Sequence, residues 1–162
     1  MTIESLQKLY ETELKDLHSM ERQIIAALPG MIKAASSPLL KTALTEHLDV
    51  TKKQLQRLDE VFAALGKSGK GKKCKGMEGV LEEGKELLAE DVAPEVLDAG
   101  IIAAAQHVEH YEMAGYGTVA AYARLLGDRQ AEALMRESLA EEKEADAKLS
   151  KLAKAINVEA AA

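Results

Sequence analysis

An apolar residue recurs every three or four positions between Leu97 and Ala123, and two carboxylates share that stripe. At about 100° per residue, Glu109 and Glu112 point in the same direction as the apolar side chains around them. A helix buries its apolar stripe, so we expect both glutamates inside the protein. A buried carboxylate is costly unless it is paired, protonated or bound to a metal ion. The pattern therefore predicts a helical core that contains a polar site.

The composition favours the same fold class. Aromatic residues make up 3% of the 162 residues and charged residues 30%, and Ala, Leu, Glu and Lys are abundant, as in helical proteins. The net charge of −6 argues against general nucleic-acid binding. No apolar run approaches the roughly 20 residues of a membrane span, and the N-terminus has no signal-peptide pattern. We expect a cytoplasmic protein with no nucleic-acid or membrane partner.

Helical periodicity predicts four long helices, over residues 2–35, 38–65, 94–126 and 129–157, and a shorter one over residues 77–90. The expected N-caps of three long helices are Thr2, Ser37 and Asp128. Pro29 is expected to kink the first helix rather than end it, because the apolar face continues beyond it. Residues 158–162 are expected to fray.

The order of these helices predicts an all-α, ferritin-like four-helix bundle, formed as one domain over residues 1–162. Two antiparallel hairpins are joined by a crossover that carries the short helix and can reach from one end of the bundle to the other. Its first part, residues 67–76, is basic and glycine-rich. We interpret it as a solvated, flexible loop in which Cys74 is incidental. A redox or regulatory thiol is the alternative.

Carboxylates of the second hairpin converge on the middle of this bundle. Glu112 and Glu142 are both about fifteen residues from the turn at residues 127–128, so antiparallel helices place them at the same height. Glu109 and Asp146 are both about eighteen residues from it. Two facing pairs of acids are therefore expected at neighbouring depths.

The first hairpin adds Glu21 and His47, which differ in height by roughly 7 Å at 1.5 Å per residue. Taken singly, each acid is better explained by pairing with a lysine or by a place just outside the core, and His47 by a satisfied core or boundary histidine. Together they are not, because no lysine or arginine lies on the inner stripes and crowded carboxylates cannot all ionise without cations. Carboxylates with one imidazole suit iron(II) or manganese(II) better than zinc. The predicted metal ligands are Glu21, His47, Glu109, Glu112, Glu142 and, as a ligand or a neighbouring acid, Asp146.

The sequence Gln-His-Val-Glu-His-Tyr-Glu at residues 106–112, followed by Gly-Tyr-Gly-Thr at 115–118, resembles the third-helix signature of the YciF/YciE-like ferritin-like stress proteins. Three further segments, at residues 16–23, 47–51 and 74–79, match in order, and Glu141-Glu142-Lys143 with Asp146 and Leu149 completes the match. The resemblance covers nearly the whole chain. It implies a ferritin-like bundle, usually a homodimer, with a di-iron-type carboxylate site and a link to stress.

Two departures concern the site. The broader ferritin-like superfamily places a Glu-x-x-His pair on its second and fourth helices, whereas no histidine here follows a glutamate by three residues. Relatives often carry an acidic pair after the second-helix histidine, and that pair here is Asp49-Val50. Loss of this acid would weaken or remove one of two metal positions.

The predicted function is a dinuclear iron or manganese site that handles peroxide or ferrous iron during stress. Its partners would be metal ions and a second copy of the chain. The alternative is a non-catalytic, dimeric stress or interaction protein without a functional metal. Iron storage is a third possibility, but the sequence gives no sign of a closed shell of many subunits.

Overall fold

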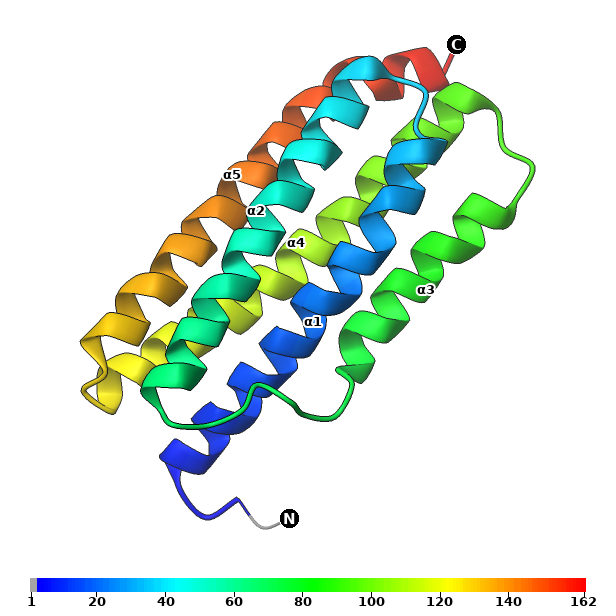
Figure 1. Cartoon of the computed structure of the whole chain (residues 1–162). Coiled ribbons are helices and arrows are strands. Elements are labelled where there is room, and N and C mark those ends of the chain that lie inside the picture. The colour runs from blue at the N-terminus through cyan, green and yellow to red at the C-terminus, as the bar shows by residue number, and fades with distance from the viewer. Residues whose placement is uncertain (1–2) are drawn as a thin grey trace.

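The computed structural model describes residues 3–162, which form helices and no strand (Figure 1). Four long helices lie along a common axis as two antiparallel hairpins, and α3 lies beside α1 and α4. The all-α bundle with one long crossover and a short extra helix, the ferritin-like arrangement, is confirmed. The five helices are α1 (Leu6–Ala34), α2 (Pro38–Ala64), α3 (Lys75–Ala89), α4 (Pro94–Leu125) and α5 (Arg129–Ala160).

The helix termini follow local sequence signals. Ser37 and Asp128 cap α2 and α5 as predicted, and each side chain accepts a hydrogen bond from a backbone N–H of the first turn. α1 begins later than predicted, with Ser5 as its N-cap, and the predicted cap Thr2 lies outside the described residues. α1 continues through Pro29 to its end, as expected.

The C-terminal prediction was wrong. Residues 158–160 continue α5 instead of fraying, and Ala161 is the C-cap residue. The physical reason is composition, because this terminus consists of alanines and a glutamate after Val158, and these are strong helix formers. No helix of the described residues is long and apolar enough to cross a membrane.

A buried carboxylate joins the two hairpins at one end of the bundle. Asp98, near the start of α4, is 4% exposed. It accepts hydrogen bonds of 2.7 Å from the backbone N–H groups of Ser36 and Ser37, in the turn between α1 and α2. Hydrogen bonds to an ionised acceptor are stronger than neutral ones. Asp98 therefore holds the first hairpin's turn against the second hairpin.

Residues 67, 68 and 70–73 of the crossover before α3 are exposed, as predicted, but Cys74 at its end is buried, which corrects the interpretation of this thiol as an incidental part of a solvated loop. Cys74 is 5% exposed; its N–H donates to Ser19 Oγ at 2.8 Å and its carbonyl accepts from Gln23 Nε2 at 3.1 Å. A Cβ on Gly69 would lie 2.8 Å from the His18 ring, so glycine lets the chain approach α1 closely. The lysine and glycine composition of this segment gave no indication of these contacts with α1.

Candidate metal centre

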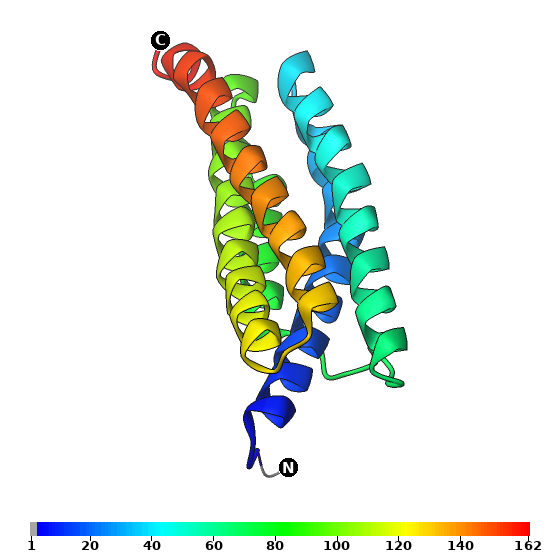
Figure 2. The ribbon, with the colours of Figure 1, turned by 90° about the vertical axis from the view of Figure 1, so that its left-hand side faces the viewer.

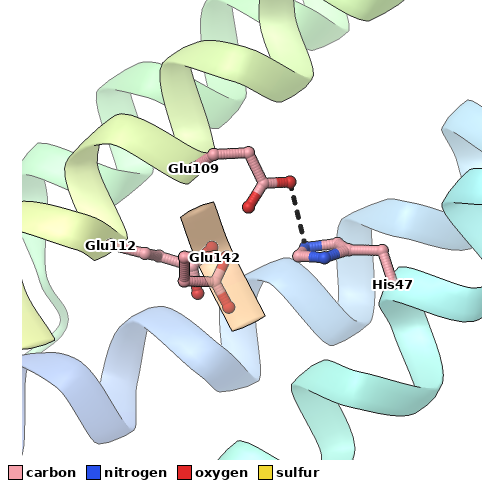
Figure 3. Close-up of side chains that lie close together, drawn as sticks. All are labelled: His47, Glu109, Glu112 and Glu142. Atoms are coloured by element: carbon pink, nitrogen blue, oxygen red, sulfur yellow. Dashed lines mark ion pairs between the residues drawn. The ribbon is translucent and has the colours of Figure 1, made fainter. Parts of the chain in front are cut away.

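Four side chains with metal-binding atoms meet in the middle of the bundle. One such atom from each of four residues lies within 4.8 Å of the other three. Metal–oxygen distances are about 2.0–2.6 Å, so ligands on opposite sides of one ion are about 4–5 Å apart. The spacing therefore fits ligation of a single ion. The residues are His47 from α2, Glu109 and Glu112 from α4, and Glu142 from α5, and their side chains point toward one another in Figure 3.

Helical periodicity brings these groups together. Glu109 and Glu112 are three residues apart, so they share the buried face of α4 with Val108 and Tyr116. α5 packs antiparallel against that face and places Glu142, which is fully buried, between its apolar neighbours. α2 closes the group from the opposite hairpin with His47.

These four residues carry polar atoms that have no protein partner. No hydrogen bond reaches either carboxylate oxygen of Glu112, Oε2 of Glu109, Oε2 of Glu142 or Nδ1 of His47. More than about 90% of buried polar groups in proteins are paired, and each unpaired one costs about 1–3 kcal/mol. Within residues 3–162, no lysine or arginine forms an ion pair with these acids. Facing acceptors without donors are what a bound cation would satisfy.

The pKa values of these side chains reflect their burial and crowding. Burial, then the neighbouring Glu142, raises the pKa of Glu109 and of Glu112 well above the usual range. Burial lowers the pKa of His47, which keeps the imidazole neutral. His47 Nε2 approaches Glu109 Oε1 at 3.5 Å, dashed in Figure 3, and burial disfavours the charged form of both groups. A bound cation would favour the ionised form of these carboxyl groups over the protonated form.

Glu21 lies next to the four-residue group and is fully buried. It accepts a hydrogen bond from the Tyr116 hydroxyl and its carboxyl group neighbours that of Glu112. Burial raises the pKa of Glu21 to about 8, although the bond from Tyr116 opposes the shift. The expected height difference within the first hairpin explains its position: His47 approaches Glu109, whereas Glu21 approaches Glu112, three residues along α4.

Asp146 lies beside the group and is not one of the four. Its side chain is 23% exposed, and it contacts Gln106 Nε2 at 2.9 Å and His110 Nε2 at 3.3 Å. Gln106 donates hydrogen bonds to Asp146 and Ser150, neither of which belongs to the four-residue group. Of the six predicted ligands, the structure brings His47, Glu109, Glu112 and Glu142 together, with Glu21 adjacent and Asp146 further out.

Two polar residues on α2 support the group. The Thr51 hydroxyl donates to the His47 carbonyl at 2.9 Å and lies 3.4 Å from its ring nitrogen. Gln54 was missed: it is fully buried, and its amide donates to Glu142 and, at 3.1 Å, to Glu141. The signal was present in the sequence, since Gln54 falls seven residues after His47 on the same stripe.

The chain matches known proteins over nearly its full length. Residues 5–162 match the family model described as Domain of unknown function (DUF892). Protein YciF of Escherichia coli (strain K12) is 41% identical over 154 residues, which cover 94% of this chain and 93% of YciF.

Solved structures also match this chain over nearly its full length. That of the E. coli stress protein YciF has a TM-score of 0.92 at 40% identity and covers 95% of this chain and 98% of that one. YcfI from Rhodopseudomonas palustris has a TM-score of 0.89 at 42% identity, over 91% and 94% of the two chains. A protein from Xanthomonas campestris pv. campestris, 20% identical, shares the fold with a TM-score of 0.79 over 96% and 95% of the chains.

Proposed function

We propose that this protein, which belongs to the DUF892 family, binds iron or manganese in its bundle core and handles peroxide or ferrous iron during stress. The observation that carries the proposal is the group of buried, facing acceptors without donors around Glu112. The similarity to the stress protein YciF supports the physiological setting. A cytoplasmic homodimer is the proposed form, and an elution mass of one chain would contradict the dimer.

The proposed first ion is held by His47, Glu109, Glu112 and Glu142, whose ligand atoms are mutually close. A second ion, which the dinuclear form requires, would use Glu21 with Glu112 and Glu142. Glu112 suits a shared position because it has both oxygens free. Asp146 would act from outside, through its charge on Glu109. The second position has no imidazole, so we expect weaker binding there.

The chain's own residues fix the geometry of this site. The Tyr116 hydroxyl, whose pKa burial raises well above its usual value, stays protonated and orients Glu21. Thr51 lies against the His47 ring, and Gln54 restrains Glu142. Such supporting contacts typically change metal affinity about 10–100-fold. A bound iron or manganese ion would supply the redox chemistry, while the burial of its ligands limits their contact with bulk water.

The test is metal analysis after anaerobic reconstitution with iron(II) or manganese(II), followed by peroxide turnover. Wild type is compared with Glu112→Ala and with Glu83→Ala, a matched control on the exposed face of α3. We expect at least one ion per chain in wild type and the control, and loss of both binding and turnover in Glu112→Ala. Less than about 0.2 ion per wild-type chain would contradict metal binding. That result would leave the non-catalytic alternative without a functional metal, whereas bound metal without turnover of peroxide or oxidation of iron(II) would contradict the proposed reaction.

A further inference from the structure

A cleft between α2 and α5 reaches the metal centre from the surface. Its volume is about 270 Å³, and two of the four clustered residues, His47 and Glu109, form part of its lining. Figure 2 shows the two helices side by side, further apart toward the end of the bundle that carries the C-terminus. We name this hollow the α2–α5 cleft; its remaining lining is Ala43, Leu44, Glu46, Val50, Glu141, Glu144, Ala145, Lys148 and Leu149.

We propose that the α2–α5 cleft is the entrance through which hydrated divalent cations reach the buried cluster, and that Glu46, Glu144 and Lys148 control their passage. The inference rests on the proposed metal-binding function. It assigns a transient cation-binding role to Glu46 and Glu144 and an opposing, gating role to Lys148, none of which is among the predicted ligands.

Size distinguishes this cleft from the approach on the opposite side of His47. An ion with six waters, at about 30 Å³ per water, needs roughly 200 Å³, which the α2–α5 cleft provides. A second cavity also touches His47 and Glu109, but its volume of about 10 Å³ is far below the roughly 200 Å³ that a hydrated ion needs. Its other lining residues are apolar, among them Ile24, Leu28 and Val108. A hydrated cation does not fit there.

Charge distinguishes the mouth of the α2–α5 cleft from its wall. Besides the buried Glu109, three carboxylates line the cleft nearer the surface, Glu46, Glu141 and Glu144, and Glu141 is neutralised by Arg57 at 2.6 Å. Within residues 3–162, Glu144 forms no ion pair and remains exposed. Beyond these acids the wall consists of alanine, valine and leucine, so the next groups able to hold a cation are His47 and Glu109. The cleft attracts cations at its mouth and does not trap them on the way.

Lys148 crosses this mouth. On α5, its ammonium group pairs with Glu46 on α2, and the two side chains are 49% and 55% exposed. An exposed pair of this kind contributes only about 0–1 kcal/mol, so it opens readily. While closed, it masks Glu46 and places a positive charge in the path of an incoming cation. Lys148 and Glu144 should therefore affect uptake in opposite directions.

The experiment is stopped-flow uptake of cobalt(II) by the metal-free full-length protein at low salt, followed by the cobalt absorption bands. The variants are Glu144→Gln and Lys148→Gln, with Glu83→Gln as the matched control on α3. The Coulomb energy between a side-chain charge and a divalent ion is twice that for a monovalent ion. We therefore expect Glu144→Gln to slow association about 3–10-fold and Lys148→Gln to accelerate it similarly. The amount bound at saturation should stay the same, and both effects should shrink at high salt.

The outcomes separate the two proposals. If wild type binds cobalt but the two variants keep its rate, or change it in the same direction, the entrance is overturned and metal binding stands. An uptake rate independent of cobalt concentration would also overturn the entrance and leave metal binding standing. In that case the charge at the mouth does not influence the rate of uptake. If wild type binds no cobalt, the metal centre itself is overturned, and the entrance with it. All variants alter exposed side chains, and circular dichroism confirms that each is folded.

Discussion

The two hairpins contribute to the candidate metal centre in different ways. The hairpin of α4 and α5 supplies three carboxylates to the four-residue group, Glu109, Glu112 and Glu142. The hairpin of α1 and α2 supplies neutral groups, the His47 imidazole and the Gln54 amide, together with one acid, Glu21. Carboxyl groups are thus concentrated on one hairpin, and the groups that orient and complete the site come from the other.

This difference explains why the first ion position has enough ligands for one ion and a second position has fewer. The first position takes groups from three helices and both hairpins. A second position would depend on Glu21 as its sole acid from the first hairpin, because α2 carries Val50 and Gln54 where further carboxylates could stand. The neutral groups of α2 also limit the repulsion that the metal-free bundle must tolerate.

The largest test of this asymmetry compares one acid from each hairpin. Glu142→Gln should weaken binding of the first ion by at least about 100-fold, whereas Glu21→Gln should weaken it no more than about tenfold and mainly reduce a second equivalent. Competition titration against a chromophoric chelator measures both. Equal losses in the two variants would contradict the difference between the hairpins.

Breaking the contact between the hairpins should have the next largest effect. Asp98→Ala removes the acceptor of two 2.7 Å hydrogen bonds and leaves two N–H groups of the α1–α2 turn without it. We expect a loss of about 2–3 kcal/mol in the free energy of unfolding, measured by urea denaturation. Asp91→Ala, an exposed control before α4, should change it by less than about 0.5 kcal/mol. Similar values for the two variants would show that Asp98 does not hold the hairpins together.

The pH dependence of the metal-free protein should reveal the crowded carboxyls. Burial raises the folded-state pKa of Glu109 and Glu112 well above the usual range and that of Glu21 to about 8. The folded state then binds more protons than the unfolded state above pH 4.5, so stability falls as pH rises toward 8. We expect Tm to drop by about 5 °C between pH 5 and pH 8. Glu112→Gln should flatten the profile, and a profile that rises with pH would refute the assigned protonation states.

The smallest predicted effect comes from adding an acid to the first hairpin, which makes it more like the second hairpin. Gln54→Glu places a fourth carboxylate against Glu142. The metal-free protein should lose about 1–2 kcal/mol of stability through like-charge repulsion and desolvation, while binding of a second ion should improve several-fold. Gln54→Leu is the control, since it removes the amide without adding charge. A second equivalent that binds no better would argue against a second position beside Glu142.

The fold was predictable because long helices, their caps and the turns depend on local sequence. Asp128 and Ser37 cap helices as expected, and the antiparallel register correctly placed Glu112 near Glu142. The register was less informative for Asp146, because equal height does not fix which way a side chain points, and Asp146 turns toward Gln106 and His110.

Interactions between distant segments could not be predicted. Burial of Cys74 depends on Ser19 and Gln23 of α1, and Asp98 finds its partners in another turn. The composition of residues 67–76 alone suggested a solvated loop in the first case, and the second contact was not predicted. Gln54 shows a different limit: its position on the inner stripe was visible, but an uncharged amide gives no sign of binding a carboxylate.

The separation of the ligands along the chain has a consequence for the lifetime of the protein. His47 and Glu142 are roughly a hundred residues apart, and an ion that joined them would act as a reversible cross-link. A covalent cross-link that closes such a loop restricts the unfolded chain by up to about 4–5 kcal/mol, and any ligand of the native state shifts the balance in the same direction. Metal-free chains would open more often and meet proteases sooner. Cellular abundance would then follow metal supply without any change in synthesis.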